Sequence, residues 1–144
     1  NAGRPVSQAL QAALSGQYAA IYAYGRAGGR LSTDEDVALT LLADHRTDRD
    51  QLRAWLLSDG EQPDPPAPAY TLPGTVRSDA AARRLLATVE LRLIPVLVQL
   101  LAEESDEARR RWAVRAVRRS ALTAQDWGAA PQAFPWPADL TPPA

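Results

Sequence analysis

The fold follows from residues 78–104, which read SDAAARRLLATVELRLIPVLVQLLAEE. Apolar residues recur here every three or four positions, which is the period of a helix with a buried face. Ser78 and Asp79 favour a helix start, because their side chains accept hydrogen bonds from free backbone N–H groups. We therefore predict a helix over 78–104, the most hydrophobic and most buried of the chain, with a kink in the turn before Pro95.

Three further segments, 6–28, 33–59 and 106–127, show the same helical period. Gly28 and Gly29 predict a left-handed cap at the end of the first segment. Ser32 and Glu35 are spaced as a capping box at the start of the second, and Ser105-Asp106-Glu107 predicts a cap at the start of the last. Residues 61–77 contain five prolines and no helical period, so they predict a long extended crossover. Two short connections and one long one predict an all-α fold, an antiparallel four-helix bundle with ferritin-like topology.

The bundle is expected to be a single domain over residues 6–128. Residues 1–5 are interpreted as a tag scar or a disordered start, and residues 129–144 as a proline-rich tail onto which Phe134 and Trp136 are expected to dock. Within the crossover, Tyr70 and Leu72 stand between prolines, and we expect them to pin it to the helices.

Composition excludes several classes of function. The chain has no cysteine, which rules out disulfides, thiolate metal sites and cysteine nucleophiles. Arg111, Arg115 and Arg118 share one face of the fourth predicted helix, but acidic neighbours, a net charge of −1 and a pI near 5.8 favour a solvated face over nucleic-acid binding. No uninterrupted apolar run approaches roughly 20 residues, so we expect no membrane span in this sequence. The expected location is cytoplasmic, and the alternative is a protein with an upstream signal or lipoprotein segment.

Polar residues interrupt the apolar seams of the first three predicted helices. Each seam advances in steps of three or four residues and contains one inward-facing polar side chain near mid-helix. The seams are Leu10-Leu14-Gln17-Ile21-Tyr24, Ala38-Leu42-His45-Arg49-Leu52-Leu56 and Leu86-Glu90-Leu93-Leu97. Midpoints of antiparallel helices of similar length share one layer, so we expect Gln17, His45 and Glu90 to converge, with Arg49 nearby.

Carboxylate-bridged dimetal bundles need more ligands than this layer offers. They place a Glu on each of two helices and a Glu-x-x-His on each of the other two. The corresponding positions here hold Gln17, Leu42 with His45, and Glu90, and the fourth predicted helix has no histidine. One carboxylate and one imidazole cannot hold two divalent cations, so we expect no dimetal centre and no ferroxidase chemistry.

Two interpretations of the polar layer remain. In the first, Glu90 and His45 form a buried hydrogen-bonded pair, and Gln17 and Arg49 satisfy the remaining groups, because unpaired buried polar groups are costly. In the second, His45, Glu90 and Gln17 bind a single divalent metal or a small polar ligand, because convergent polar groups are where bundles bind ligands.

Several motifs together resemble a family of ferritin-like domains of unknown function from high-GC bacteria. The resemblance covers nearly the whole chain and implies the ferritin-like bundle without an established activity. It is carried by residues 9–14 (ALQAAL), 18–25 (YAAIYAYG), His45-Arg46 with Arg49-Asp50, 68–73 (PAYTLP), and Glu90 with Arg92.

The sequence therefore predicts a non-enzymatic binding or interaction module without a cofactor. Tyr18, Tyr22 and Tyr24 of the alanine- and tyrosine-rich first helix are interpreted most simply as packing residues with hydrated hydroxyls. The alternative for them is a homodimer face on this helix, because aromatic residues are enriched at interfaces. The alternative is a ferritin-like protein that binds one metal ion or a small ligand at Gln17, His45 and Glu90.

Overall fold

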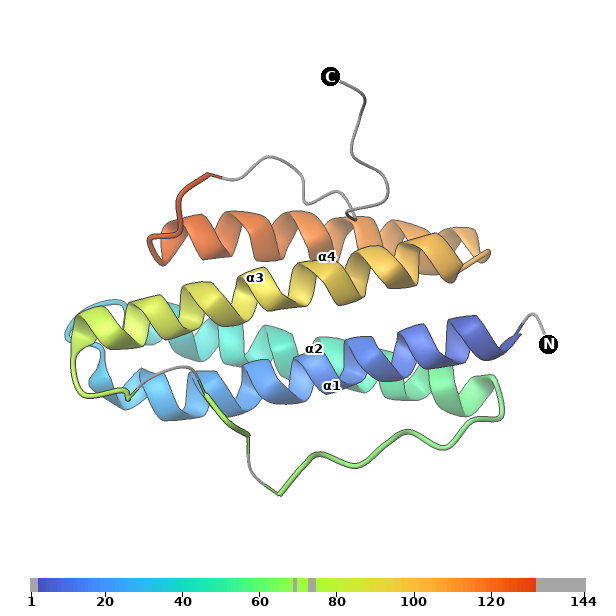
Figure 1. Ribbon diagram of the computed structural model, residues 1–144, viewed down its shortest axis with the longest axis horizontal. Coiled ribbons are helices and arrows are strands. Elements are labelled where there is room, and N and C mark those ends of the chain that lie inside the picture. The colour runs from blue at the N-terminus through green and yellow to red at the C-terminus, as the bar shows by residue number, and fades with distance from the viewer. Residues whose placement is uncertain (1–2, 69, 73–74, 132–144) are drawn as a thin grey trace.

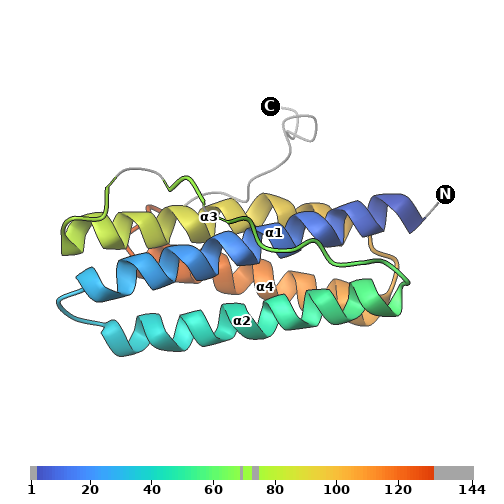
Figure 2. The ribbon, with the colours of Figure 1, turned by 90° about the horizontal axis from the view of Figure 1, so that it is seen from below.

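The protein folds as four long helices that lie nearly side by side (Figure 1, Figure 2). The computed structural model describes residues 3–68, 70–72 and 75–131, and this part of the chain contains no strand. The helices are α1 (Gly3–Ala27), α2 (Glu35–Ser58), α3 (Asp79–Glu103) and α4 (Glu107–Asp126), with a short 3-10 turn, η1 (Gly28–Arg30), after α1. Backbones approach closely between α1 and α2, α1 and α3, and α3 and α4. The prediction of an all-α, antiparallel four-helix bundle with a long crossover is confirmed.

Two of the predicted helix starts have the expected caps. The Ser78 hydroxyl accepts a hydrogen bond from the Ala81 N–H at 3.1 Å, and Asp106 accepts one from the Arg109 N–H at 2.9 Å. The capping box predicted at Ser32 is wrong, because the Ser32 N–H and hydroxyl instead donate to Asp79 Oδ1 at 2.9 and 3.1 Å. The loop after η1 is thereby tied to the start of α3, and α2 begins at Glu35.

The first helix also differs from its prediction at both ends. It begins at Gly3, inside the stretch 1–5 that we expected to precede the helix, and Pro5 fits because a first-turn proline needs no N–H partner. Residues 1 and 2 lie outside the described residues. The left-handed cap predicted at Gly28 and Gly29 is wrong, since the chain tightens there into η1. Among the described glycines, positive φ occurs at Gly60 and Gly128, which follow α2 and α4.

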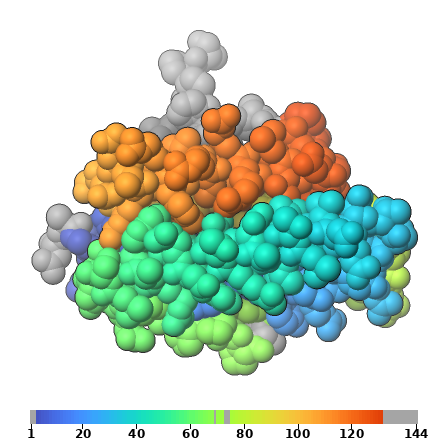
Figure 3. Space-filling model, turned by 180° about the vertical axis from the view of Figure 1, so that it is seen from behind, coloured from blue at the N-terminus to red at the C-terminus, as the bar shows by residue number. Residues whose placement is uncertain are grey.

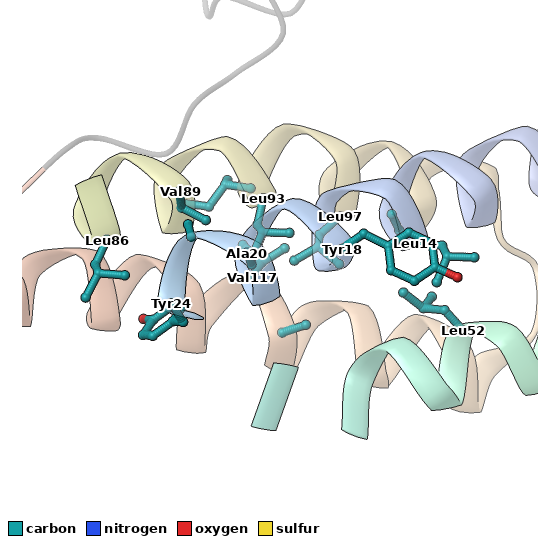
Figure 4. Close-up of a cluster of buried hydrophobic side chains, with 14 of the residues drawn as sticks. Leu14, Tyr18, Ala20, Tyr24, Leu52, Leu86, Val89, Leu93, Leu97 and Val117 are labelled. Atoms are coloured by element: carbon teal, nitrogen blue, oxygen red, sulfur yellow. The ribbon is translucent and has the colours of Figure 1, made fainter. Parts of the chain in front are cut away.

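The core is built from aliphatic and small side chains of all four helices (Figure 4). The α1–α3 interface is especially close at Gly16, where an added Cβ would lie 2.9 Å from Leu93 Cδ2 and 3.3 Å from Val96 Cγ2. A side chain at position 16 would therefore force the side chains of Leu93 and Val96, or the two helices, to move.

The crossover between α2 and α3 runs back over α1 (Figure 2). Its backbone is held by Gln11, which donates to the Gln62 carbonyl and accepts from the Asp64 N–H, both at 2.9 Å. Tyr70 and Leu72 are half-buried against the core, as predicted, and the Tyr70 ring lies 5.5 Å from that of Tyr22.

The tyrosines of α1 point inward or under the crossover. Tyr18 is buried and its hydroxyl donates to the Asp64 carbonyl at 3.0 Å, Tyr22 packs on Tyr70, and Tyr24 is only 2% exposed. These three rings therefore serve as packing residues, the first of the two roles expected for them, and they do not form an exposed aromatic face on α1.

Helix α3 is the most apolar element. By length and composition it is the one helix in the described residues that could cross a membrane, with a mean hydropathy of 1.9 over its best 18-residue window. The expectation of no membrane span rested on the interruption of the apolar run, whereas α3 is apolar enough in spite of Arg92 and Pro95. Half of that window is buried inside the bundle, and a helix packed on both α1 and α4 needs the same apolar surface. Residues 132–144 of the proline-rich tail, including Phe134 and Trp136, lie outside the described residues.

Candidate functional site

The structure brings Gln17, His45 and Glu90 into one hydrogen-bonded chain in the core. They come from the middle of α1, α2 and α3 and are 1%, 4% and 1% exposed. His45 Nδ1 lies 2.8 Å from Gln17 Oε1, and His45 Nε2 lies 2.7 Å from Glu90 Oε1. Both ring nitrogens of the histidine are therefore engaged by other side chains.

Two aromatic residues extend this chain toward the end of α4. The Tyr24 hydroxyl donates to Glu90 Oε1 at 2.7 Å, and the Trp127 indole N–H donates to the Tyr24 oxygen at 2.9 Å. Neither residue was predicted to join the site, since Tyr24 occupies an apolar seam position and Trp127 stands at a predicted helix end. The sequence could have predicted a polar partner for Tyr24, because a tyrosine in a fully buried seam position needs a hydrogen bond for its hydroxyl. We refer to Gln17, His45, Glu90, Tyr24 and Trp127 as the polar chain.

The donors and acceptors of the polar chain fix its net charge. An amide oxygen only accepts, so with the Gln17 amide oriented as it is, His45 Nδ1 must carry a hydrogen. The short contact between His45 Nε2 and Glu90 Oε1 then needs one more proton. That proton gives either an imidazolium with a carboxylate or a neutral imidazole with a carboxylic acid. Both states leave the pair neutral overall, which suits a site shielded from water.

Electrostatics keep Tyr24 protonated. Burial raises the pKa of its hydroxyl far above the usual value, and the adjacent Glu90 raises it further. Tyr24 therefore acts as a hydrogen-bond donor to Glu90 across the accessible pH range, and it takes no part in proton exchange near neutral pH.

Arg49 does not join the site, contrary to the expectation. Its side chain is 30% exposed and its Nε donates to Asp50 Oδ1 at 2.9 Å. Asp48 takes the inward position instead, one turn after His45, and forms an ion pair with Arg119 of α4. The seam of α2 steps by three residues after His45, whereas the predicted seam stepped by four. Burial raises the pKa of the Asp48 carboxyl, although the Arg119 charge opposes that shift.

Comparison with known proteins assigns the family. A model of a domain of unknown function, DUF4439, matches residues 9–138. The chain belongs to this family. The crystal structure of a conserved hypothetical protein, rv2844, from Mycobacterium tuberculosis is similar to the DUF4439 domain described here, with a TM-score of 0.83 and 28% sequence identity. The similarity covers 87% of this chain and 96% of that one. No curated protein matches the chain.

The DUF4439 domain offers few ligands for a metal ion. Within residues 3–68, 70–72 and 75–131, no group of three or more His, Asp or Glu side chains is arranged to hold a cation. A metal bound between an imidazole nitrogen and a carboxylate oxygen at about 2.0–2.2 Å from each holds them roughly 3 Å or more apart. His45 Nε2 and Glu90 Oε1 are 2.7 Å apart, which is the distance of a direct hydrogen bond.

The outer end of the polar chain borders a cavity of about 350 Å³ that opens to the surface. Trp127 forms one wall, and the guanidinium of Arg83 lies 5.6 Å from the centre of the indole ring. Arg83 is held there by Asp79 at 2.9 Å and by Asp34 at 3.0 Å. The cavity lining comprises Asp34, Val37, Leu41, Arg83, Thr123, Asp126 and Trp127. Trp127 separates this space from Tyr24 and the rest of the polar chain.

Proposed function

We propose that this DUF4439 domain is a ferritin-like bundle that acts as a non-enzymatic binding or interaction module and holds no dimetal centre. The topology supports the ferritin-like assignment, because two antiparallel hairpins joined by one long crossover are the arrangement of those bundles. In them, the middle layer of the core carries the metal ligands. In this chain the same layer holds a hydrogen-bonded set of side chains.

One observation carries the proposal: both nitrogens of the chain's single histidine are within 2.8 Å of partner side chains. An imidazole must offer a lone pair to bind a metal, and this one is occupied on both sides. The carboxylate of Glu90 accepts from Tyr24 at the same oxygen that faces His45. The layer therefore works as an internal support for the helices.

Metal analysis tests the proposal directly. Protein purified without chelator should contain no stoichiometric Fe, Mn or Zn by elemental analysis. Addition of each ion should give no heat in calorimetry and no shift in the melting temperature, because a ligand that binds only the folded state would raise it. Two metal ions per chain, held after dialysis and lost with His45→Ala, would overturn the proposal.

The alternative function is a site for one metal ion or a small polar ligand at His45, Glu90 and Gln17. The cavity beside Trp127 supports this alternative, since it gives a ligand a space that approaches the polar chain from the surface. A ligand would have to displace the Trp127 indole from Tyr24, which would change tryptophan fluorescence. Binding of one Zn²⁺ or Mn²⁺ per chain with such a change would favour the alternative over the internal support.

A further inference from the structure

Helix α4 concentrates positive charge in a chain that is acidic overall. It contains six arginines and two acidic residues, whereas the whole chain has a net charge of −1. The six arginines do not all serve the fold in the same way, and their contacts separate them into two groups.

Three of these arginines are committed to internal contacts. Arg109 binds Asp59 through two hydrogen bonds of 2.8 Å, and Arg119 forms the ion pair with Asp48. Arg110 donates to the Leu101 and Glu104 carbonyls at 2.6 and 3.0 Å, which satisfies the end of α3.

The other three, Arg111, Arg115 and Arg118, follow one another along the exposed face of α4. Arg111 is paired with Glu107 at 3.1 Å, but the two side chains are 65% and 82% exposed, so the pair contributes little and exchanges easily with another anion. No ion pair involves Arg115 or Arg118 within the described residues.

Two aliphatic side chains stand in the same row. Val114 is 41% exposed and Leu122 is 60% exposed, and they lie three residues after Arg111 and four residues after Arg118. Residues three and four apart are neighbours on a helix surface, so these two aliphatic side chains lie on the same exposed face as the three arginines. We call this face the α4 crest; it comprises Arg111, Val114, Arg115, Arg118 and Leu122. Figure 3 shows α4, in orange, along the outer edge of the molecule.

We propose that the α4 crest docks the domain on the surface of an anionic lipid bilayer. A helix at the outer edge can meet a flat surface along its length, and guanidinium groups pair well with lipid phosphates. Val114 and Leu122 would reach the boundary of the acyl chains, as apolar residues of interfacial helices do. This inference rests on one part of the proposed function, that the domain acts as a binding module.

The aliphatic residues favour a bilayer over a nucleic acid. A nucleic-acid backbone rewards the arginines and gives nothing for an exposed leucine. Charge and apolar surface contribute together at a bilayer surface, because its anionic head groups lie next to a hydrocarbon phase. The two contributions can be separated by mutation, which gives the proposal its test.

Vesicle sedimentation is the test. Wild-type protein should bind vesicles of phosphatidylcholine with about 30% phosphatidylglycerol much more tightly than pure phosphatidylcholine, and about 1 M salt should release it. Arg111→Gln, Arg115→Gln and Arg118→Gln together should lower the partition by about a hundredfold, since each basic residue contributes about fivefold near such a surface. No binding to the anionic vesicles would overturn the proposal, whereas the metal analysis tests the core separately.

A matched control changes the same charge elsewhere. Arg26, Arg46 and Arg84 are exposed on α1, α2 and α3, so their replacement by Gln alters the net charge equally but leaves the crest intact. The proposal requires this variant to keep most of its binding. Equal losses from both triple variants would show a general charge effect and refute a docking surface.

The apolar contribution is tested with Val114→Ser and Leu122→Ser, which leave all charges in place. Vesicle binding should fall several-fold, while retention on heparin should stay unchanged, because heparin offers charge without hydrocarbon. Equal binding of both serine variants and the wild type to vesicles, or tighter binding of the wild type to mixed-sequence duplex DNA than to vesicles, would contradict the bilayer. Leu122→Ser alone gives a milder variant, and a thermal melt confirms that each protein is folded.

Discussion

The α1–α3 and α2–α4 sides of the bundle are held together in different ways. On the α1–α3 side, the helices come close enough for Gly16 to face Leu93 without a side chain between them. On the α2–α4 side, Cα atoms of the two helices do not approach within 8 Å. Long side chains bridge that gap: the Trp55 and Trp112 rings meet at 5.1 Å, and Asp48 and Asp59 pair with Arg119 and Arg109.

This difference shows how the bundle keeps a polar layer in its core. An apolar interface needs only shape, and its stability is insensitive to pH. An interface bridged by charged and aromatic side chains depends on each group having a partner. Helix α2 therefore depends more on specific polar contacts than α3 does, both at His45 inside the core and at Asp48 and Asp59 near its surface.

Removal of the His45 side chain should cause the largest loss of stability among the polar contacts of α2. His45→Ala leaves Gln17 without its partner and leaves Glu90 with only the Tyr24 hydroxyl in a dry core. Breaking a buried charge pair costs about 3–5 kcal/mol. Urea unfolding followed by circular dichroism measures the loss. Glu90→Gln in the same chain should recover part of it, because a neutral amide costs less to leave unpaired than a carboxyl group that can ionise. Strictly additive losses in the two single variants and the double variant would contradict a coupled pair.

The close α1–α3 interface is tested at Gly16. Gly16→Val should destabilise the protein by about 1–3 kcal/mol, because overpacking forces neighbouring side chains and backbone to move. Gly25→Val is the matched control, since Gly25 lies in the same helix and a Cβ there meets nothing within 4 Å. If both variants unfold at the same urea concentration, the helices are less tightly apposed at Gly16 than the structure indicates.

The α1–α3 side is also the part of the fold that the sequence predicts well. The helical period of residues 78–104 and the apolar seam of the first helix depend on local spacing alone, and Ser78 and Asp106 cap helices through neighbours three residues away. The crossover was predictable because prolines exclude a helix and Tyr70 and Leu72 are too apolar to stay exposed. These features depend on residues that are close in the sequence, so they can be predicted from one sequence.

The polar contacts depended on geometry that the sequence does not contain. The convergence of Gln17, His45 and Glu90 followed from their equal depth in their helices, but Trp127 reaches Tyr24 across 103 positions of the chain. Asp48 rather than Arg49 faces the core because the buried seam of α2 advances by three residues after His45, and the sequence pattern alone allows three or four. Ser32 does not cap α2 because it donates hydrogen bonds to Asp79, which comes within reach only when the chain has folded. Tertiary competition of this kind overrides local preference.

The smallest effects on stability are expected from the two ion pairs on the α2–α4 side, Asp48 with Arg119 and Asp59 with Arg109. Partly exposed pairs contribute only about 0–1 kcal/mol each. Burial raises the pKa of Asp48, so its contribution to stability is present below the unfolded pKa of about 3.9 and is lost as pH rises through the folded value. The hydrogen bonds from Arg109 lower the pKa of Asp59, so the contribution of Asp59 to stability is present above that unfolded pKa and is lost as pH falls through the folded value.

Urea unfolding at about pH 3 and about pH 7 should therefore show opposite trends for the two ion pairs. Relative to Asp48→Asn the wild type should lose stability with rising pH, and relative to Asp59→Asn it should gain stability. The same sign for both variants would mean that burial of Asp48 does not outweigh its pairing with Arg119.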